Sequence, residues 1–309
     1  MRVAALAGGT GGAKLAAGLQ DAVGSKLSVI ANTGDDTEVL GVHVSPDPDL
    51  ITYWLSGEID EERGWGIRGD TFTTFERLVK LGAPEWFGLS DRDLATCLRR
   101  RELLDRGTTP TVAQAEIAAA LGVEARVLPM SDDPVRTRIR TADGWRPFQE
   151  YLVRDGATAA VEKVEFEGAD AAAPSGEVLE AIAAAEAIVI GPSNPVISIA
   201  PILAVPGIRE AIAAASAPVV AVSPFVAGRA IKGPTEPFML AGGHEPSATG
   251  VAEIYGDLLD GLVVDAGDPD PPPPSPRSIV IPTLMDDRAA RRRVAEATLE
   301  FAAALGRSE

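Results

Sequence analysis

The chain has 309 residues, of which 46% are hydrophobic and 24% charged, and its net charge at pH 7 is −17. Nucleic acids and anionic membranes bind basic surfaces, so this charge excludes both as expected partners and leaves small anionic ligands open. One cysteine, Cys97, and two histidines, His43 and His244, are too few for a disulfide framework or a Cys- or His-rich metal site, and neither histidine lies in a recognisable nucleophile motif.

Residues 1–31 have the pattern of a strand, a glycine turn, a helix and a second strand. Residues 3–6 and 27–31 are short apolar runs typical of buried strands, and residues 14–23 carry apolar side chains at helical spacing. This order predicts a βαβ unit with a parallel sheet.

The character of the chain changes between residues 52 and 149, where tryptophans and charged residues cluster. The spacing of apolar residues predicts helices at 71–81, 91–104 and 112–121, and short strands at 126–129 and 136–141. We interpret this stretch as an inserted, largely helical region that covers the substrate.

The α/β pattern resumes after residue 150. Predicted helices and strands follow one another at 175–185, 187–190, 208–215, 219–222, 262–264, 278–282 and 287–305. The predicted fold class is α/β, with a Rossmann-like, mostly parallel sheet. Residues 1–51 and 150–309 form its core, and 52–149 form the insertion.

Polar residues follow four of the predicted strands at their carboxyl ends. These loops begin at Gly8, Asn32, Gly191 and Ser223. In an open α/β sheet, ligands bind outside the carboxyl ends of the strands. The four loops are therefore predicted to converge on one site.

The glycine run GGTGG at residues 8–12 fits neither standard nucleotide motif. The dinucleotide fingerprint G-x-G-x-x-G would have its third glycine at Lys14, and a P-loop needs Ser or Thr directly after its lysine, where Leu15 stands. Glycines before a helix still let backbone amides approach an anion. The run either binds a phosphoryl group or makes only a tight turn, and Lys14 either reaches a phosphate or is a solvated lysine.

Two acidic stretches follow the second predicted strand. Asp36 ends NTGDD at residues 32–36, and Asp49 lies in SPDPDL at 45–50. In a Rossmann-like unit an acid near the first stretch contacts a ribose. Alternatively, such carboxylates hold magnesium together with substrate phosphates, or they are solvated turn residues.

Several stretches, in order from residue 5 to about 264, resemble one protein family. They read AGGTGGAKLAAGL, VIANTGDDTEVLGVHVSPDPDLITYWLSG, IDEERGWGIRGDTFTTFERL, WFGLSDRDLAT, LPMSDDPVRTRI, IGPSNPVISIAPILAVPGIR, VAVSPFVAGRAIKGP and GVAEIYGDLLDGLVV. The resemblance is to the 2-phospho-L-lactate transferase family of coenzyme F-420 biosynthesis, including its bacterial phosphoenolpyruvate-transferring branch.

This resemblance implies a Rossmann-like α/β fold with a helical insertion and a magnesium-dependent transferase. In the implied reaction, the ribityl 5′-hydroxyl of the deazaflavin Fo attacks the distal phosphate of a lactyl or enolpyruvoyl guanosine diphosphate ester. GMP then leaves, and F-420-0 or its dehydro form is the product. Dimers are common among relatives, so a homodimer is implied as well.

The resemblance also implies roles for individual residues. Asp36 and Asp49 are implied as magnesium ligands and catalytic carboxylates, with Asp49 also contacting the attacking hydroxyl of Fo and accepting its proton. Arg92, Ser131 and Asp133 are implied near Fo. The residues implied to contact the donor are Gly8, Gly9, Thr10, Gly11, Gly12 and Lys14 at its phosphates, and Asn32, Ser193, Asn194 and Ser223 at its guanosine.

Other interpretations stay open on the sequence. One alternative is a non-enzymatic regulator of the same superfamily that binds nucleotide-sugars, and another is an NAD-dependent oxidoreductase, which Lys14 at the third glycine place disfavours. The stretch around Trp65 fits either a lid over Fo or a packing role. No residue indicates whether the transferred acid is the lactyl, enolpyruvoyl or glyceryl one.

The sequence predicts a cytoplasmic protein without a membrane partner. No apolar run reaches the roughly 18 residues that a bilayer-spanning helix needs. The N-terminal residues enter a predicted strand directly, without the pattern of a secretory signal.

Overall fold

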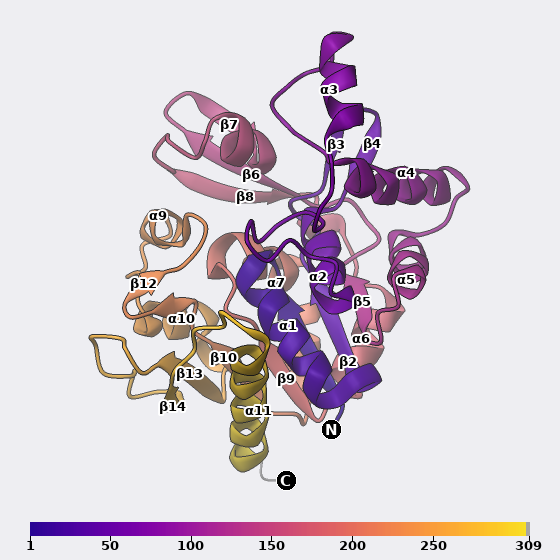
Figure 1. Cartoon of the computed structure of the whole chain (residues 1–309). Coiled ribbons are helices and arrows are strands. Elements are labelled where there is room, and N and C mark those ends of the chain that lie inside the picture. Colours follow the sequence, from indigo (N-terminus) through magenta and orange to yellow (C-terminus); the bar gives the residue numbers. More distant parts are fainter. Residues whose placement is uncertain (307–309) are drawn as a thin grey trace.

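A seven-stranded parallel sheet lies at the centre of the computed structural model, which describes residues 1–306 (Figure 1). Its strands are β1 (Val3–Ala7), β2 (Leu27–Ala31), β5 (Arg126–Pro129), β9 (Ala187–Ile190), β10 (Val219–Val222), β13 (Gly261–Asp265) and β14 (Arg277–Ile281). They run in the order β14-β13-β10-β9-β1-β2-β5, and each pairing is parallel. The predicted α/β fold with a mostly parallel sheet is confirmed.

Helices cover both faces of this sheet. One face carries α1 (Gly9–Val23), α2 (Pro46–Ser56) and α11 (Arg288–Leu305), and the other carries α6 (Gly176–Ala183), α7 (Ala200–Ala204), α8 (Ile208–Ala214) and α10 (Ala248–Tyr255). Alternate residues of β1 enter the two cores: Leu6 packs in one, and Ala5 in the other. Strands buried on both faces are apolar throughout, which explains why the sequence shows them as continuous runs.

Smaller elements surround this three-layer core. They are an antiparallel sheet of β6 (Arg136–Thr141), β7 (Gly144–Pro147) and β8 (Lys163–Glu167), the hairpins β3 (Thr37–Val39)–β4 (Val42–Val44) and β11 (Phe225–Val226)–β12 (Arg229–Ala230), and the helices α3 (Thr73–Lys80), α4 (Asp91–Asp105), α5 (Pro110–Ala120) and α9 (Thr235–Ala241). In Figure 1, the β6–β8 sheet, α3 and α4 stand above the central layers.

The structure corrects the predicted division of the chain. The boundary at residue 52 falls inside α2, whose start and end carry the usual signals, a proline at Pro46 and a left-handed glycine at Gly57. Strand β5, assigned to the insertion, pairs with β2 in the central sheet. Strand β8, assigned to the core, pairs with β6 of the insertion. Strand pairing joins segments that are distant in the sequence. The spacing of apolar residues along the chain could therefore not reveal these pairings.

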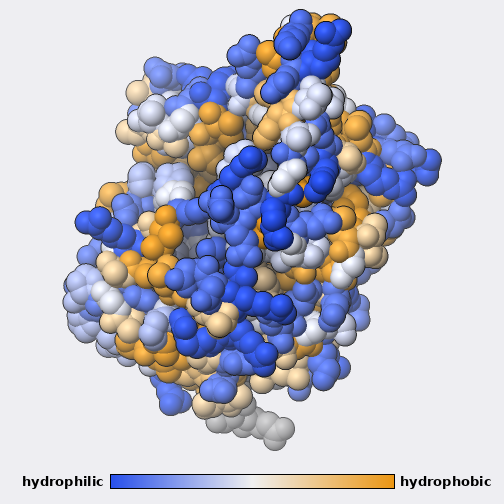
Figure 2. Space-filling view, viewed as in Figure 1, coloured by the Kyte–Doolittle hydropathy of each residue, from blue (hydrophilic) through white to orange (hydrophobic). Residues whose placement is uncertain are grey.

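Hydrophilic side chains cover most of the face seen in Figure 2, with apolar patches between them. Within residues 1–306, no single helix has both the length and the apolar character to cross a membrane. One bent pair of helical segments, Pro195–Ala204 with Ile208–Ala214, passes that test by length and composition only.

Candidate active site

A cavity of about 590 Å³ opens beyond the carboxyl ends of β1, β9 and β10. The chain leaves β1 toward β2 on one side, whereas β9 and β10 lie on the other, so β1 and β9 flank the point where the strand order reverses. Ligands bind at such switch points. The predicted donor residues that line this cavity are Gly8, Gly9, Thr10, Gly11, Lys14, Ser193, Asn194 and Ser223. The predicted convergence of the loops that contribute them is confirmed.

The glycine run is not a loop before the helix, because α1 begins at Gly9. Gly9 has φ +62°, and the Gly8 amide donates to Ser193 Oγ at 3.3 Å. A Cβ at Gly11 would collide with the Pro192 carbonyl oxygen, and one at Gly12 with Ser193 Oγ. The glycines therefore let the first turn of α1 pack directly against the loop after β9. The same turn borders the cavity with its backbone.

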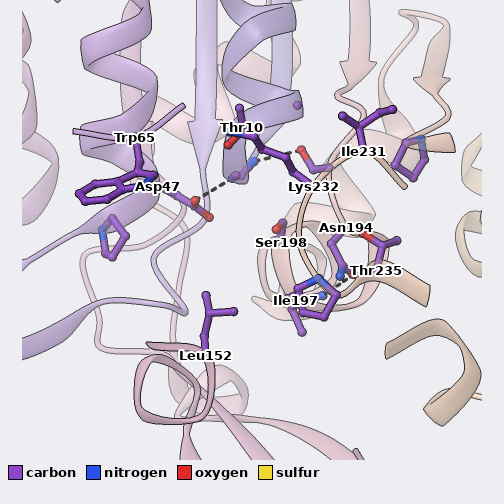
Figure 3. A pocket seen from close by; sticks show the side chains of 18 of the residues that line it. Thr10, Asp47, Trp65, Leu152, Asn194, Ile197, Ser198, Ile231, Lys232 and Thr235 are labelled. Carbon is purple, nitrogen blue, oxygen red and sulfur yellow. Dashed lines mark hydrogen bonds between the residues drawn. The ribbon is translucent and has the colours of Figure 1, made fainter. Parts of the chain in front are cut away.

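Two buried carboxylates, Asp35 and Asp47, line this cavity. Figure 3 shows Asp47 beside the glycine turn. Asp47 Oδ1 accepts a hydrogen bond from the Gly9 amide at 2.7 Å, and Asp47 Oδ2 accepts one from Asn32 Nδ2 at 3.0 Å. Asn32 Oδ1 in turn accepts from the Gly34 amide at 2.8 Å. Asn32 is fully buried and does not line the cavity. Its side chain links the turn at Gly34 to Asp47 and so joins the two acidic segments.

Burial is the main cause of a raised pKa in both acids. It raises the pKa of Asp47 to about 6, although the hydrogen bonds from Gly9 and Asn32 lower it. Burial and the charge of Asp47 raise the pKa of Asp35 well above its ordinary value. Oδ1 of Asp35 is buried and has no hydrogen-bond partner within residues 1–306. Two neighbouring carboxylates of this kind are suited to share a cation.

Lys14 is the cation that the sequence placed at this site, and it lines the cavity. Its Nζ donates to the Met285 carbonyl at 2.9 Å and lies 5.6 Å from the centre of the Trp54 ring. Burial, followed by the charges of Arg291 and Lys232, lowers the pKa of Lys14. A partly buried ammonium whose hydrogen-bond partner is a neutral backbone carbonyl is well placed to bind an anion.

The family model described as 2-phospho-L-lactate transferase CofD matches residues 3–275. The chain belongs to the CofD family. A phosphoenolpyruvate transferase of Kitasatospora aureofaciens is 47% identical over 276 residues, which are 87% of this chain and 86% of that protein. A 2-phospho-L-lactate transferase of Methanosarcina mazei is 42% identical over 262 residues, 84% of this chain and 86% of that protein.

The solved structures support the fold. A upf0052 family member from Bacillus halodurans superposes with a TM-score of 0.64 at 20% identity, over 96% of this chain and 98% of its own. At this identity the likeness shows the fold alone. The prediction that the chain is an enzyme, a transferase, rests on its membership of the CofD family and on its named relatives, and it is confirmed.

The two acids that the sequence favoured, Asp36 and Asp49, do not line the cavity. Asp36 accepts from Ser45 Oγ at 2.7 Å and contacts His43 Nε2 at 3.0 Å. Asp49 is buried and binds the Arg100 guanidinium through both oxygens. Residues two apart on a helix differ by about 200° in direction, so Asp47 and Asp49 face opposite sides of α2. In this CofD-family chain, the residues of the two acidic segments that line the cavity are therefore Asp35 and Asp47, whereas the role of Asp36 and Asp49 as magnesium ligands stays a prediction.

The residues predicted near Fo lie elsewhere as well. Arg92 is exposed at the start of α4, where its Nη1 donates to the Arg68 carbonyl at 3.4 Å. Ser131 and Asp133 border a second, smaller cavity of about 90 Å³ that Asp36 also lines. The Ser131 hydroxyl donates to the Ala173 carbonyl and accepts from the Asp133 amide, which closes a turn.

The sequence did not single out most of the remaining lining of the cavity. Its apolar part, here called the aromatic wall, includes Phe72, Phe87, Phe148 and Leu152. Trp65, Lys232 and Thr235 line the cavity as well, with Trp65 beside Asp47 and Lys232 beside Thr10 in Figure 3. Figure 3 shows Leu152 facing the group around Thr10 and Asp47 from across the cavity. The aromatic residues come from separate segments, so only a resemblance over the whole chain could have suggested them. Together the two halves suit a ligand with phosphates at one end and a flat ring at the other.

A buried polar network lies behind the Asp49–Arg100 pair. Ligand atoms of Asp49, Asp93 and Cys97 lie within 4.8 Å of one another. The guanidinium of Arg100 already supplies the positive charge there, and burial raises the pKa of the Cys97 thiol far above its ordinary value. These features favour a structural network over a metal site for this cluster within the described residues, and magnesium binding by Asp49 stays a prediction.

Replacing Asp93 with asparagine is expected to flatten the pH dependence of stability. Burial and the charge of Asp49 raise the pKa of Asp93 to about 6, while the Tyr53 hydroxyl, 2.8 Å away, opposes them. A folded pKa above the unfolded value of about 4 gives stability that is complete below pH 4 and lost as pH rises through 6. The Tm of the wild type should fall more between pH 4 and pH 7 than that of Asp93→Asn. Parallel Tm curves from thermal melts would contradict this.

Proposed function

We propose that the chain transfers 2-phospholactate or phosphoenolpyruvate from a guanosine diphosphate ester to the ribityl 5′-hydroxyl of Fo, in coenzyme F-420 biosynthesis. One observation carries the proposal. A single cavity joins the glycine turn, two carboxylates and a lysine at one end to an aromatic wall at the other. The polar end suits a diphosphate and the aromatic wall suits the deazaflavin ring. Relatives named for both transferred acids, at similar identity, support the same substrate class.

The proposed reaction is a displacement at phosphorus. The hydroxyl oxygen of Fo forms a bond to the phosphorus that carries the acid, the bond from that phosphorus to the GMP oxygen breaks, and the hydroxyl proton is released. Such transfers depend on positioning and charge neutralisation more than on a covalent nucleophile. Backbone amides at the start of α1, with Lys14, supply donors for the phosphoryl oxygens, so neither histidine is needed.

Magnesium is part of this proposal, with Asp35 and Asp47 as the side chains that would hold it. The buried Oδ1 of Asp35, which has no partner in residues 1–306, fits a metal ligand better than a structural carboxylate. Mg²⁺ is commonly held by one or two carboxylates together with substrate phosphates. When bound, it neutralises charge on the diphosphate. A homodimer and a cytoplasmic location also remain predictions.

A turnover assay tests the proposed function and names the acid. Purified protein is mixed with Fo, magnesium and, in turn, the lactyl, enolpyruvoyl and glyceryl guanosine diphosphate esters. GMP and the phosphodiester product are followed by mass spectrometry. We expect product from at least one donor and none when Fo or magnesium is omitted. Binding of nucleotide-sugars without turnover of any donor, and without binding of Fo, would contradict the proposal.

A further inference from the structure

The polar end of the cavity holds a second lysine, Lys232, to which the sequence motifs gave no role. It lies between β12 and α9 and lines the cavity together with Lys14. Lys232 Nζ lies against Gly64, whose carbonyl accepts a hydrogen bond from Thr10, one helical turn before Lys14. In agreement with this placement, the charge of Lys232 lowers the pKa of Lys14. Within residues 1–306, each donates to a backbone carbonyl: Lys14 to Met285 and Lys232 to Arg63, both at 2.9 Å.

This arrangement is unusual for a chain with a net charge of −17. Two neighbouring cations repel each other, and a carboxylate partner would remove that cost. A backbone carbonyl is a neutral acceptor, whereas a phosphoryl oxygen makes a shorter and stronger charge-assisted hydrogen bond. The charges of Glu61 and Asp286 act on Lys14 without a hydrogen bond to its ammonium. Two lysines that line one cavity and donate to neutral acceptors therefore indicate an anionic ligand there.

Lys232 reaches its present partner on a loop far away in the sequence. Residues 60–66, here called the strap, carry the Arg63 carbonyl and the glycine Gly64. The Lys232 ammonium occupies the space where a Cβ of Gly64 would lie, and Thr10 Oγ1 donates to the Gly64 carbonyl at 3.3 Å. In Figure 3, Lys232 and Thr10 are neighbours at the first turn of α1. The lysine thus stands where the glycine turn, the strap and the cavity meet.

The strap does not depend on Lys232 for its shape. The Asp60 amide donates to the Gly66 carbonyl at 3.0 Å, and the Gly64 amide donates to the Asp60 carbonyl at 2.7 Å. Glu61 pairs with Arg291 of α11 at 2.9 Å. These contacts hold the strap without any contribution from Lys232. The exposed Lys232 ammonium can therefore change its acceptor without unfolding the loop.

We propose that Lys232 binds the diphosphate of the donor ester as a second cation, together with Lys14. On donor binding its ammonium exchanges the Arg63 carbonyl for a phosphoryl oxygen. This inference rests on the proposed function and adds a residue to the same site. No bond to carbon or phosphorus changes in this exchange, since only a hydrogen-bond acceptor is replaced.

The test measures GDP binding by calorimetry in the presence of magnesium, for the wild type, Lys232→Met, Lys232→Arg and the control Lys80→Met on exposed α3. Methionine keeps most of the apolar stem and removes the charge. We expect Lys232→Met to weaken GDP binding roughly 10- to 100-fold, as for loss of a charged hydrogen bond. Lys232→Arg should recover most of the affinity, Lys80→Met should bind like the wild type, and the Tm of all variants should be unchanged.

The outcomes separate this inference from the proposed function. If the wild type does not bind GDP at all, the proposed donor is wrong and both fall. If the wild type binds GDP and Lys232→Met binds it equally well, only the role of Lys232 is wrong. If Lys232→Met and Lys232→Arg lose affinity alike and both melt at lower temperature, Lys232 holds the strap in place instead, and the exchange of acceptors is refuted.

Discussion

Replacing Asp35 with asparagine is expected to lower turnover roughly 10²- to 10³-fold, the scale seen when one preorganised charge-stabilising group is removed from an active site. The carboxylate is buried at the cavity, one of its oxygens has no partner in residues 1–306, and asparagine binds magnesium less well than a carboxylate. The apparent magnesium concentration for half-maximal turnover should rise in parallel. Steady-state rates over a magnesium series, with Fo and the preferred donor saturating, measure both effects.

The same variant is expected to be more stable without metal. Burying a charged carboxylate costs free energy, and asparagine removes that charge at almost constant volume. The Tm of metal-free Asp35→Asn at neutral pH should therefore exceed that of the wild type, and magnesium should raise the Tm of the wild type more. A lower Tm together with lost turnover would mean that Asp35 is a structural residue.

Asp36→Asn is the matched control for this experiment. Its carboxylate, one residue away, binds Ser45 and His43 and does not line the cavity. Turnover of Asp36→Asn should stay well above that of Asp35→Asn. The reverse ranking would return the role of magnesium ligand to Asp36, as the family resemblance implied.

Replacing Arg100 with methionine is expected to cost about 3–5 kcal/mol of the free energy of unfolding. Arg100 and Asp49 are both buried, and Asp49 raises the pKa of Arg100 in spite of the opposing effect of burial. Removing the guanidinium leaves the buried negative charge of the Asp49 carboxylate without its hydrogen-bonded charge partner. Urea denaturation monitored by circular dichroism measures this loss.

A double replacement shows whether the cost comes from the unpaired charge. In Asp49→Leu/Arg100→Met both charges are gone, so most of the lost stability should return. The turnover of the double variant, counted per folded molecule, also separates two roles of Asp49. Near-normal turnover would assign Asp49 to the structure, whereas a stable but inactive double variant would support the implied contact with Fo.

Much of the fold was predictable because it depends on local pattern. Continuous apolar runs predicted the central strands to within a residue or two, since strands buried on both faces have no polar side. The glycine turn and the loop at Ser193 and Asn194 were also predicted, because each follows such a run directly. The family could be assigned from the sequence, since the motifs occur in a specific order along most of the chain.

The tertiary structure decided which members of each motif face the ligand. Asp47 rather than Asp49, and Asp35 rather than Asp36, line the cavity, because the direction of a side chain depends on how α2 and the turn after β2 dock on the sheet. Lys232 and the aromatic wall come from segments far apart in the sequence, and so does the β5 edge of the sheet. The sequence by itself determined the elements and the family of this protein. Only the packing of distant segments determined the site, because a cavity wall is made of contacts that no single stretch of chain contains.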